Sequence, residues 1–403
     1  MNHKPVVSID VAKGKSVAAA FLSYNECVRK PFPFKHDPAE IVPVLELLEL
    51  LEQTTGIQPC VVLEATGIYS KPIVSYFSER GYPVVVLNPL YTHQLKKRAV
   101  RKIKTDPIDA IRIAQAFYLG EGTIHRPHHQ KTLELQVLCR QYYQWSDLFG
   151  DVQTHFRTIL DLIFPGYDKV FHKVYNAASL ELLASFPTPQ EVLTANRNVL
   201  LQILKQNRRG QAWNEQKLDH LLTIARGSLP DSYAQGAHRV ALHSYITMIR
   251  SYREGIANIE AQMLSLAESI DPYTLIRTIP GVGPITAAVI VAEIGDIKRF
   301  PSSKQLTAFA GLDSSVYESG TFKARQNRIT KRGSVYLRTA LYQATVCGIS
   351  EQIHGPRNPI LSRYYQQKRA EGKEAKLAIV ATSNKLLRMV FGIWSNQTPF
   401  RAE

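Results

Sequence analysis

The chain has 403 residues, 45% of them hydrophobic, which is enough for two or three domains with their own cores and excludes a chain disordered throughout. Lysine and arginine number 49 against 34 aspartates and glutamates, and the net charge of +15 favours a polyanionic partner. Basic clusters recur along the chain, so nucleic acid fits better than a membrane surface. No run of about 18 apolar residues predicts a spanning helix, and the N-terminus lacks the apolar part of a signal peptide.

The four cysteines are scattered, with no CxxC pair and no histidine pair nearby. This spacing does not suit a zinc site or a disulfide framework. We therefore expect buried or partly buried thiols in a reducing cytoplasm, at Cys27, Cys60, Cys139 and Cys347.

The first 90 residues alternate short apolar runs with helical patterns. Three strands are predicted first, in a meander at residues 5–10, from Val17 and at 27–33. A helix at about 37–53, a strand at 60–63, a helix at about 69–80 and a strand at 83–88 follow. This order predicts an α/β domain in which helices cover the faces of the sheet.

Acidic residues stand where these elements end or begin. Asp10 closes the first strand, Glu64 closes a later strand, and Asp106 and Asp109 lie three residues apart around Pro107 at the start of a helix. Each acid alone has a structural explanation, as a turn residue, a surface acid, a helix cap or a first-turn acid. Together, at the sheet edge where ligands bind in open α/β folds, they predict a site for two Mg²⁺ ions acting on a phosphodiester.

A basic run precedes the last two acids. Six of the nine residues from Lys96 to Lys104 are basic. A solvated charged surface accounts for such a run, and so does an approach for a polyanion to the acids. The residues concerned are Lys96, Lys97, Arg98, Arg101, Lys102 and Lys104.

Two long amphipathic helices are predicted in the middle of the chain. The first spans about 125–164, and the second spans about 233–270 with Val240, Ile246 and Met263 on one stripe. They can pair as an antiparallel coiled coil with the shorter helices of residues 165–230 inserted between them. Ordinary helices on a globular core explain the periodicity equally well.

The segment LIRTIPGVGPITAAVIVAEIGDI, from Leu275, predicts a helix, a tight hairpin at Gly281 and Gly283, and a second helix that begins at Pro284. Glycines let the backbone approach a phosphate, and the N–H groups of the following helix then face the anion. This helix–hairpin–helix pattern predicts a grip on a nucleic-acid backbone. The alternative is a tight turn between two core helices.

A loop rich in serine, glycine and basic residues follows, and its cations predict a second phosphate-binding cluster. The cations are Lys323, Arg325, Arg328, Lys331 and Arg332. The loop also carries Ser314, Ser315 and Ser319. By chemistry alone such a serine is a turn residue or a phosphate donor, because a nucleophile needs an activating base or metal.

Six motifs in order make the chain resemble the DEDD-type transposases of the insertion-sequence one-ten family, which includes the Piv-like DNA invertases. They are SIDVAK, LEATGIY, KTDPIDA, IPGVGPITAA, FAGLDSSVYESG and RITKRGSVYLR. The resemblance covers nearly the whole chain. It implies a RuvC-like, ribonuclease-H-type first domain in which Asp10, Glu64, Asp106 and Asp109 bind Mg²⁺. It also implies a serine nucleophile in a Ser-Gly motif, which matches Ser319 and Gly320, with Ser315 as the competing position.

The resemblance further implies a recombinase that cuts and rejoins donor and target double-stranded DNA through a phosphoserine link, guided by a structured non-coding RNA. We expect a RuvC-like domain at 1–125, a helical coiled-coil and dimerisation region at 126–270, and a mainly helical C-terminal domain at 271–403. A dimer, or a tetramer when two DNA sites are joined, would work in the cytoplasm at the nucleoid, away from membranes. Two alternatives are a metal-dependent Holliday-junction-type endonuclease and an architectural nucleic-acid-binding protein.

Overall fold

The computed structural model describes the backbone of most of the chain, namely residues 4–65, 67–89, 92, 106–120, 123–124, 130–205, 211–313, 318–319, 322–323 and 329–401. Side chains are described in the same ranges except at 123–124, 211–213, 318–319 and 322–323. The chain divides into two compact units, Met1–Pro127 and His128–Glu403. The predicted further division at residue 270 stays a prediction.

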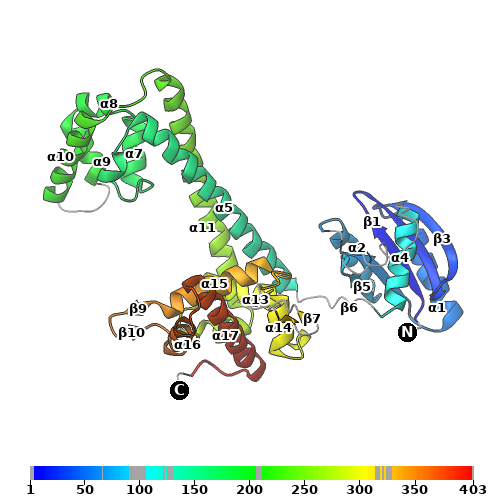
Figure 1. Ribbon diagram of the computed structural model, residues 1–403. Coiled ribbons are helices and arrows are strands. Elements are labelled where there is room, and N and C mark those ends of the chain that lie inside the picture. The colour runs from blue at the N-terminus through cyan, green and yellow to red at the C-terminus, as the bar shows by residue number, and fades with distance from the viewer. Residues whose placement is uncertain are drawn as a thin grey trace. The chain divides into compact units, whose positions relative to one another are not determined.

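The first unit is built on a six-stranded sheet with the order β3-β2-β1-β4-β5-β6 (Figure 1). The strands are β1 (Val6–Val11), β2 (Lys15–Ser23), β3 (Glu26–Lys35), β4 (Cys60–Glu64), β5 (Val84–Leu87) and the two-residue β6 (Thr123–Ile124). Strand β1 is antiparallel to β2 and parallel to β4, and β4 is parallel to β5. The predicted meander of the first three strands is confirmed.

Helices cover both faces of this sheet. Successive side chains of a strand point to opposite faces, so each strand contributes to two separate cores. Val7, Ile9 and Leu63 face one core with α1 (Val42–Thr55) and α2 (Ser70–Glu79). Val6 and Val62 face the other core with α4 (Asp106–Tyr118). A mixed sheet of this order, with helices on both faces, is a ribonuclease-H-like fold.

Helix α1 begins later than predicted. The Asp37 carboxylate accepts hydrogen bonds from the N–H groups of Ala39 and Glu40, at 3.1 and 2.9 Å. These bonds hold residues 37–40 in a turn, because a short acidic side chain competes with the helix for backbone donors. The helix therefore starts at Val42, next to Pro43.

The second unit contains the two long helices, α5 (Gln130–Ile163) and α11 (Gln235–Glu268), which run side by side (Figure 1). The ring of Trp145 lies 5.5 Å from that of Tyr252, and the ring of His155 lies 6.2 Å from that of Tyr245. The contact ten residues further along α5 is made by a residue seven positions earlier in α11. The two helices are therefore antiparallel, as predicted for the coiled coil.

The predicted apolar stripe of α11 is wrong at one position. Val240 is 68% exposed, whereas Leu242 is fully buried with Ile246 and Ile249. At this end α11 packs into a small helical cluster and not only against α5, so the buried face turns toward the inserted helices.

Those inserted helices form their own core at one end of the long pair (Figure 1). They are α6 (Tyr167–Val170), α7 (Ala177–Ser185), α8 (Pro189–Thr194), α9 (Arg197–Lys205) and α10 (Gln211–Gly227). Phe156 and Leu160 of α5 and Ile246 of α11 are buried in this core. We call this cluster the tip.

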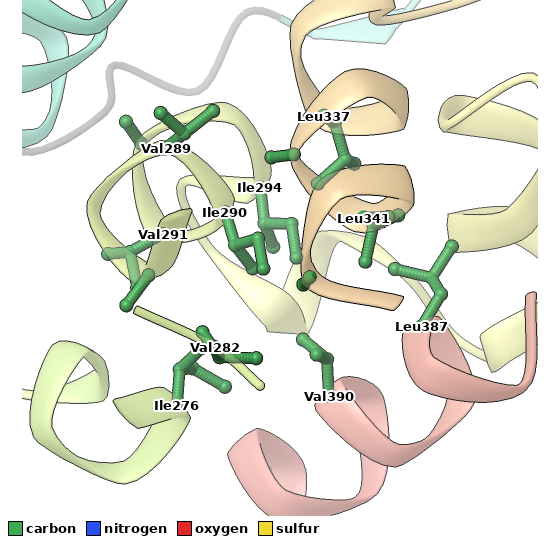
Figure 2. Close-up of a cluster of buried hydrophobic side chains, with 14 of the residues drawn as sticks. Ile276, Val282, Val289, Ile290, Val291, Ile294, Leu337, Leu341, Leu387 and Val390 are labelled. Atoms are coloured by element: carbon green, nitrogen blue, oxygen red, sulfur yellow. The ribbon is translucent and has the colours of Figure 1, made fainter. Parts of the chain in front are cut away.

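The other end of the long pair packs into a larger helical core. Its remaining elements are α12 (Pro272–Arg277), α13 (Pro284–Ile294), the short 3₁₀ helix η1 (Ile297–Arg299), α14 (Ser303–Phe309), α15 (Val335–Ile349), α16 (Pro359–Ala370) and α17 (Ala375–Asn396). Two short hairpins add β7 (Glu318–Ser319) with β8 (Phe322–Lys323), and β9 (Glu351–Gln352) with β10 (Gly355–Pro356). Figure 2 shows α13 side chains, among them Ile290 and Ile294, facing Leu337 and Leu341 of α15 and Leu387 of α17.

Helix α17 corrects the expectation that no segment is long and apolar enough to span a membrane. By length and composition alone it passes that test. However, Leu386, Leu387, Val390 and Trp394 are buried against the helices of this core. Such a contact face is what a core helix of a globular unit requires.

The cysteines follow the prediction in three cases. Cys60 and Cys139 are buried, Cys347 is partly buried, and all four thiols are free. Burial raises the pKa of the Cys60 and Cys139 thiols, which makes both less reactive. Cys27 is exposed, contrary to the prediction, because it lies on β3 at the edge of the sheet.

Candidate active site

Asp10 and Glu64 lie side by side at one edge of the sheet. The parallel register pairs Ile9 of β1 with Leu63 of β4, and each acid is the next residue on its strand. Neighbouring strands are about 4.8 Å apart. The alternation that sends Ile9 and Leu63 to the α1 side sends both carboxylates to the α4 side. The predicted juxtaposition of these two acids is therefore present.

Asp106 and Asp109 occupy the first turn of α4, the helix that covers that face. Asp106 is exposed, whereas Asp109 is 9% exposed and forms an ion pair with Arg112, in which the two atoms Nη1 and Oδ1 are 3.1 Å apart. The i, i+3 spacing puts both acids on one face of α4. Asp106 is the first residue of the helix and stays nearer solvent, whereas Asp109 is buried.

The four carboxylates supply hard oxygen donors, which are the donors that Mg²⁺ prefers. Among the residues that the structure describes, however, no three aspartate, glutamate, histidine or cysteine side chains are close enough to enclose a metal ion. Glu64 instead accepts a hydrogen bond from the Thr92 hydroxyl at 2.7 Å, and Asp109 contacts Arg112. The acids fit a divalent cation in kind and in their place on the fold.

Ser319 belongs to the second unit. Its backbone pairs with Phe322 in the hairpin of β7 and β8. Within the loop from Ser314 to Arg328 the structure describes only the backbone of 318–319 and 322–323. Ser315, Arg325 and Arg328 lie outside the described residues, and so do the side chains of Ser319 and Lys323.

The two ends of this loop are held together by what we call the stem, residues 309–313 and 329–334. Thr330 donates its N–H to the Asp313 carbonyl at 2.9 Å and its hydroxyl to the Asp313 carboxylate at 2.5 Å. Lys331 donates to the Gly311 carbonyl at 3.2 Å, and Ser334 donates to the Phe309 carbonyl at 2.9 Å. The serine loop therefore starts and ends on a bonded base.

Two glycines allow this close approach. Gly311 and Gly333 have φ of +66° and +118°, a region that favours glycine. A Cβ at Gly333 would overlap the Phe309 carbonyl, and one at Gly311 would lie 2.6 Å from the Arg332 carbonyl. Lys331 between them also has a positive φ of 54°, which is uncommon outside glycine. Sequence reasoning missed the stem, although its two glycines were a usable signal.

The predicted helix–hairpin–helix is present as α12, a turn and α13, but its two glycines have different surroundings. Gly281, with φ +99°, packs on α15, where an added Cβ would lie 2.5 Å from the Gly348 Cα. Gly283 has no atom within 4 Å of such a Cβ. The core-turn explanation therefore accounts for Gly281, while only Gly283 offers the open backbone that a phosphate needs.

The basic residues are described only in part. Lys331 and Arg332 are exposed at the stem. The run of Lys96, Lys97, Arg98, Arg101, Lys102 and Lys104 lies outside the described residues. Their contacts with phosphates stay predictions.

The fold and the acidic edge define a protein with a DEDD nuclease-type domain followed by a largely helical region. Residues 7–165 match the transposase family defined by a DEDD domain of the IS110 type, and residues 273–366 match the Transposase IS116/IS110/IS902 family. The chain belongs to this family of transposases, which implies binding to DNA and, for the DEDD domain, a divalent metal.

Three similar proteins have names that refer to gene inversion or to insertion elements. A pilin gene-inverting protein from Moraxella lacunata is 22% identical over 401 residues, which is 98% of each chain. The transposase for insertion sequence element IS1111A from Coxiella burnetii is 30% identical over 170 residues, 40% of this chain and 43% of that one. An uncharacterized 43.6 kDa protein of insertion element IS110 from Streptomyces coelicolor is 22% identical over 323 residues, 79% of this chain and 78% of that one.

Proposed function

We propose that the chain cuts and rejoins DNA at a donor and a target site, with Ser319 as the nucleophile. The observation that carries the proposal is that two reactive sets occur in one chain: strand-edge carboxylates in the first unit and Ser319 on a stem-held loop in the second. A hydrolytic nuclease needs only the first set. The proposal requires both sets to act on one phosphodiester, within a chain or between two chains.

The covalent step is a transesterification. The Ser319 hydroxyl loses its proton, its oxygen bonds to phosphorus, and the bond from phosphorus to one deoxyribose oxygen breaks. That oxygen leaves as a hydroxyl group, and a hydroxyl of another DNA end later attacks the phosphoserine and releases Ser319. Each step exchanges one phosphate ester for another, so no external energy source is needed.

The four acids would hold Mg²⁺, which supplies charge stabilisation of the phosphate in the transition state. The chain's own part is to orient the Ser319 oxygen and to bind the DNA backbone. Exposed Lys331 and Arg332 and the open N-terminal turn of α13 after Gly283 are the described groups suited to that binding.

We propose that a structured guide RNA selects the DNA sites by base pairing with donor and target DNA. The described candidates for nucleic-acid contact are exposed cations and backbone N–H groups, which suit phosphate contacts that position a nucleic acid without specifying its sequence. We also propose that the long pair of α5 and α11 joins two copies of the chain, and that the assembly acts at the nucleoid in the cytoplasm.

The test is covalent trapping with the full chain, Mg²⁺, its co-purified RNA and labelled DNA carrying the ends of the element that encodes it. We expect a protein–DNA adduct on a denaturing gel that is lost in Ser319→Ala and Asp10→Ala and kept in Ser315→Ala. An adduct lost only in Ser315→Ala would move the nucleophile to that residue. Mg²⁺-dependent cleavage that survives Ser319→Ala would instead support the junction-type endonuclease.

A further inference from the structure

A buried carboxylate joins three elements of the second unit. The side chain of Glu293, in α13, has no exposed surface, and glutamate is almost never so buried unless it is paired. Arg140 of α5 binds it with two nitrogens, Nε to Oε1 at 2.8 Å and Nη2 to Oε2 at 3.1 Å. Oε2 also accepts a hydrogen bond from the Ser334 hydroxyl at 2.7 Å. We call these three residues the clamp.

Ser334 connects the clamp to both α15 and the stem. Its hydroxyl oxygen accepts from the Leu337 N–H at 3.1 Å and so caps α15, while the hydroxyl hydrogen goes to Glu293. Its own N–H donates to the Phe309 carbonyl at 2.9 Å, which is one of the bonds of the stem. The orientation of one serine is therefore determined by three partners at once.

The bonded pair nearest the loop, Asp313 and Thr330, lies six residues before Ser319 and eleven residues after it. The Ser334 N–H bond to the Phe309 carbonyl joins the two stem segments, so the position of Ser334 helps to set their alignment. Because reacting atoms must be placed to within fractions of an ångström, a shift of about 1 Å can cost about a hundredfold in rate.

On its other side the clamp holds the beginning of α5. Arg140 lies in the third turn of α5, and one turn earlier the Gln136 side chain donates to the Ala292 carbonyl at 3.2 Å. Helix α5 is the first element of the second unit after its boundary at residue 128. The clamp thus fastens the start of the long helix to the base of the serine loop.

Stability alone is a weak explanation for this arrangement. A buried ion pair is often no more stabilising than apolar side chains of the same size, because both charges lose their hydration. A bidentate pair with a third, directional bond instead defines a geometry. All three bonds are made to one carboxylate at hydrogen-bond distance.

We propose that Glu293, held by Arg140, is a positioning residue that orients the Ser319 loop through Ser334 and the stem. The inference rests on the proposed role of Ser319. It adds that the rate of adduct formation depends on a carboxylate that does not touch DNA.

The experiment compares Glu293→Gln, Ser334→Ala and Ser334→Thr in the full chain. The first variant removes the charge and places an amide N–H₂ where an acceptor is needed. The second removes the hydroxyl, and the third keeps it. Thr188→Ala is the matched control, because Thr188 caps α8 in the tip with the same kind of hydrogen bond and is remote from the stem.

Two readouts separate positioning from stability: the rate of adduct formation at saturating DNA, and hydrogen exchange at the amides of Thr330, Lys331 and Ser334. We expect Glu293→Gln and Ser334→Ala to slow adduct formation by about ten- to a hundredfold with unchanged DNA affinity, and to speed exchange at the stem. Ser334→Thr should restore both values. Thr188→Ala should lower Tm without changing either.

Adduct rates within twofold of wild type in Glu293→Gln and Ser334→Ala would overturn the inference, and so would an equal loss in Thr188→Ala. An adduct that persists in Ser319→Ala would overturn the proposed nucleophile separately. In that case faster stem exchange in Glu293→Gln would still support the clamp, and unchanged exchange would refute it.

Discussion

Glu64 ends a buried strand, and its position follows directly from the chain: an apolar run from Cys60 places the next residue at the sheet edge. The hydrogen-bond partner of its carboxylate cannot be predicted from the local sequence. The Thr92 hydroxyl, 28 residues away, donates to its carboxylate at 2.7 Å. The folded structure therefore adds a partner that the local pattern does not reveal.

This partner makes Glu64→Gln a clean test of the acidic site. The amide oxygen of glutamine can still accept from Thr92, so we expect the free energy of unfolding to change by less than about 0.5 kcal/mol. The lost charge should lower the rate of adduct formation at least about a hundredfold, because a neutral amide holds Mg²⁺ poorly. Thermal melting and the trapping assay measure the two effects. An active variant would remove Glu64 from the site.

Gly281 and Gly283 form a second test at this scale. Gly281→Ala should destabilise the chain by about 1–3 kcal/mol, because its φ is positive and the new Cβ meets the backbone of Gly348. Gly283→Ala should cost less than about 1 kcal/mol, since its φ of −79° suits any residue and its surroundings are open.

For DNA binding we expect the larger effect from Gly283→Ala and the smaller one from Gly281→Ala. If α13 contacts a phosphate, Gly283→Ala should weaken binding to duplex DNA, measured by fluorescence anisotropy with correctly folded protein. DNA affinity that is unchanged in Gly283→Ala would mean that the turn serves the core alone.

At the scale of elements, the long helices illustrate what periodicity can and cannot predict. The 3.6-residue pattern is local, and it predicted both helices to within about five residues at each end. Which helix lies against which is decided by side-chain shape over distant positions. Trp145 of α5 packs where α11 has Gly255, and no window of sequence contains both residues.

Gly255→Ala should therefore destabilise the protein, although alanine normally favours a helix over glycine by about 1 kcal/mol. An added Cβ would overlap the indole ring of Trp145. Gly150→Ala, in α5, is the matched control because no atom lies within 4 Å of its Cβ position, and we expect it to raise stability by about 0.5–1 kcal/mol. Differential scanning calorimetry should show opposite shifts in Tm. Equal shifts would argue against this packing.

At the scale of the whole molecule, the net charge of +15 predicts salt-dependent binding to nucleic acid. Lys331→Asn tests whether the stem contributes, since asparagine tolerates the positive φ of this residue. We expect weaker binding to every DNA sequence tested and a salt slope smaller by about 1.

Lys35→Asn is the control for charge, because the Lys35 ammonium is already paired with Glu40 at 2.7 Å. It should leave the slope nearly unchanged. Loss of affinity for a single sequence in Lys331→Asn would show that Lys331 reads bases and does not contact a phosphate.

The sequence by itself determined the order of elements, the α/β character of the first unit, the paired strand-edge acids and the family. These depend on short-range patterns: alternation along strands, the helical period, and motifs of a few residues. Only the tertiary structure decided that Gly281 serves internal packing and that the serine loop rests on a bonded stem. It also brought Arg140 and Ser334, which are 194 residues apart in the sequence, to the carboxylate of Glu293. Such groups meet only when separate helices pack, because burial and hydrogen-bond geometry are properties of the assembled core.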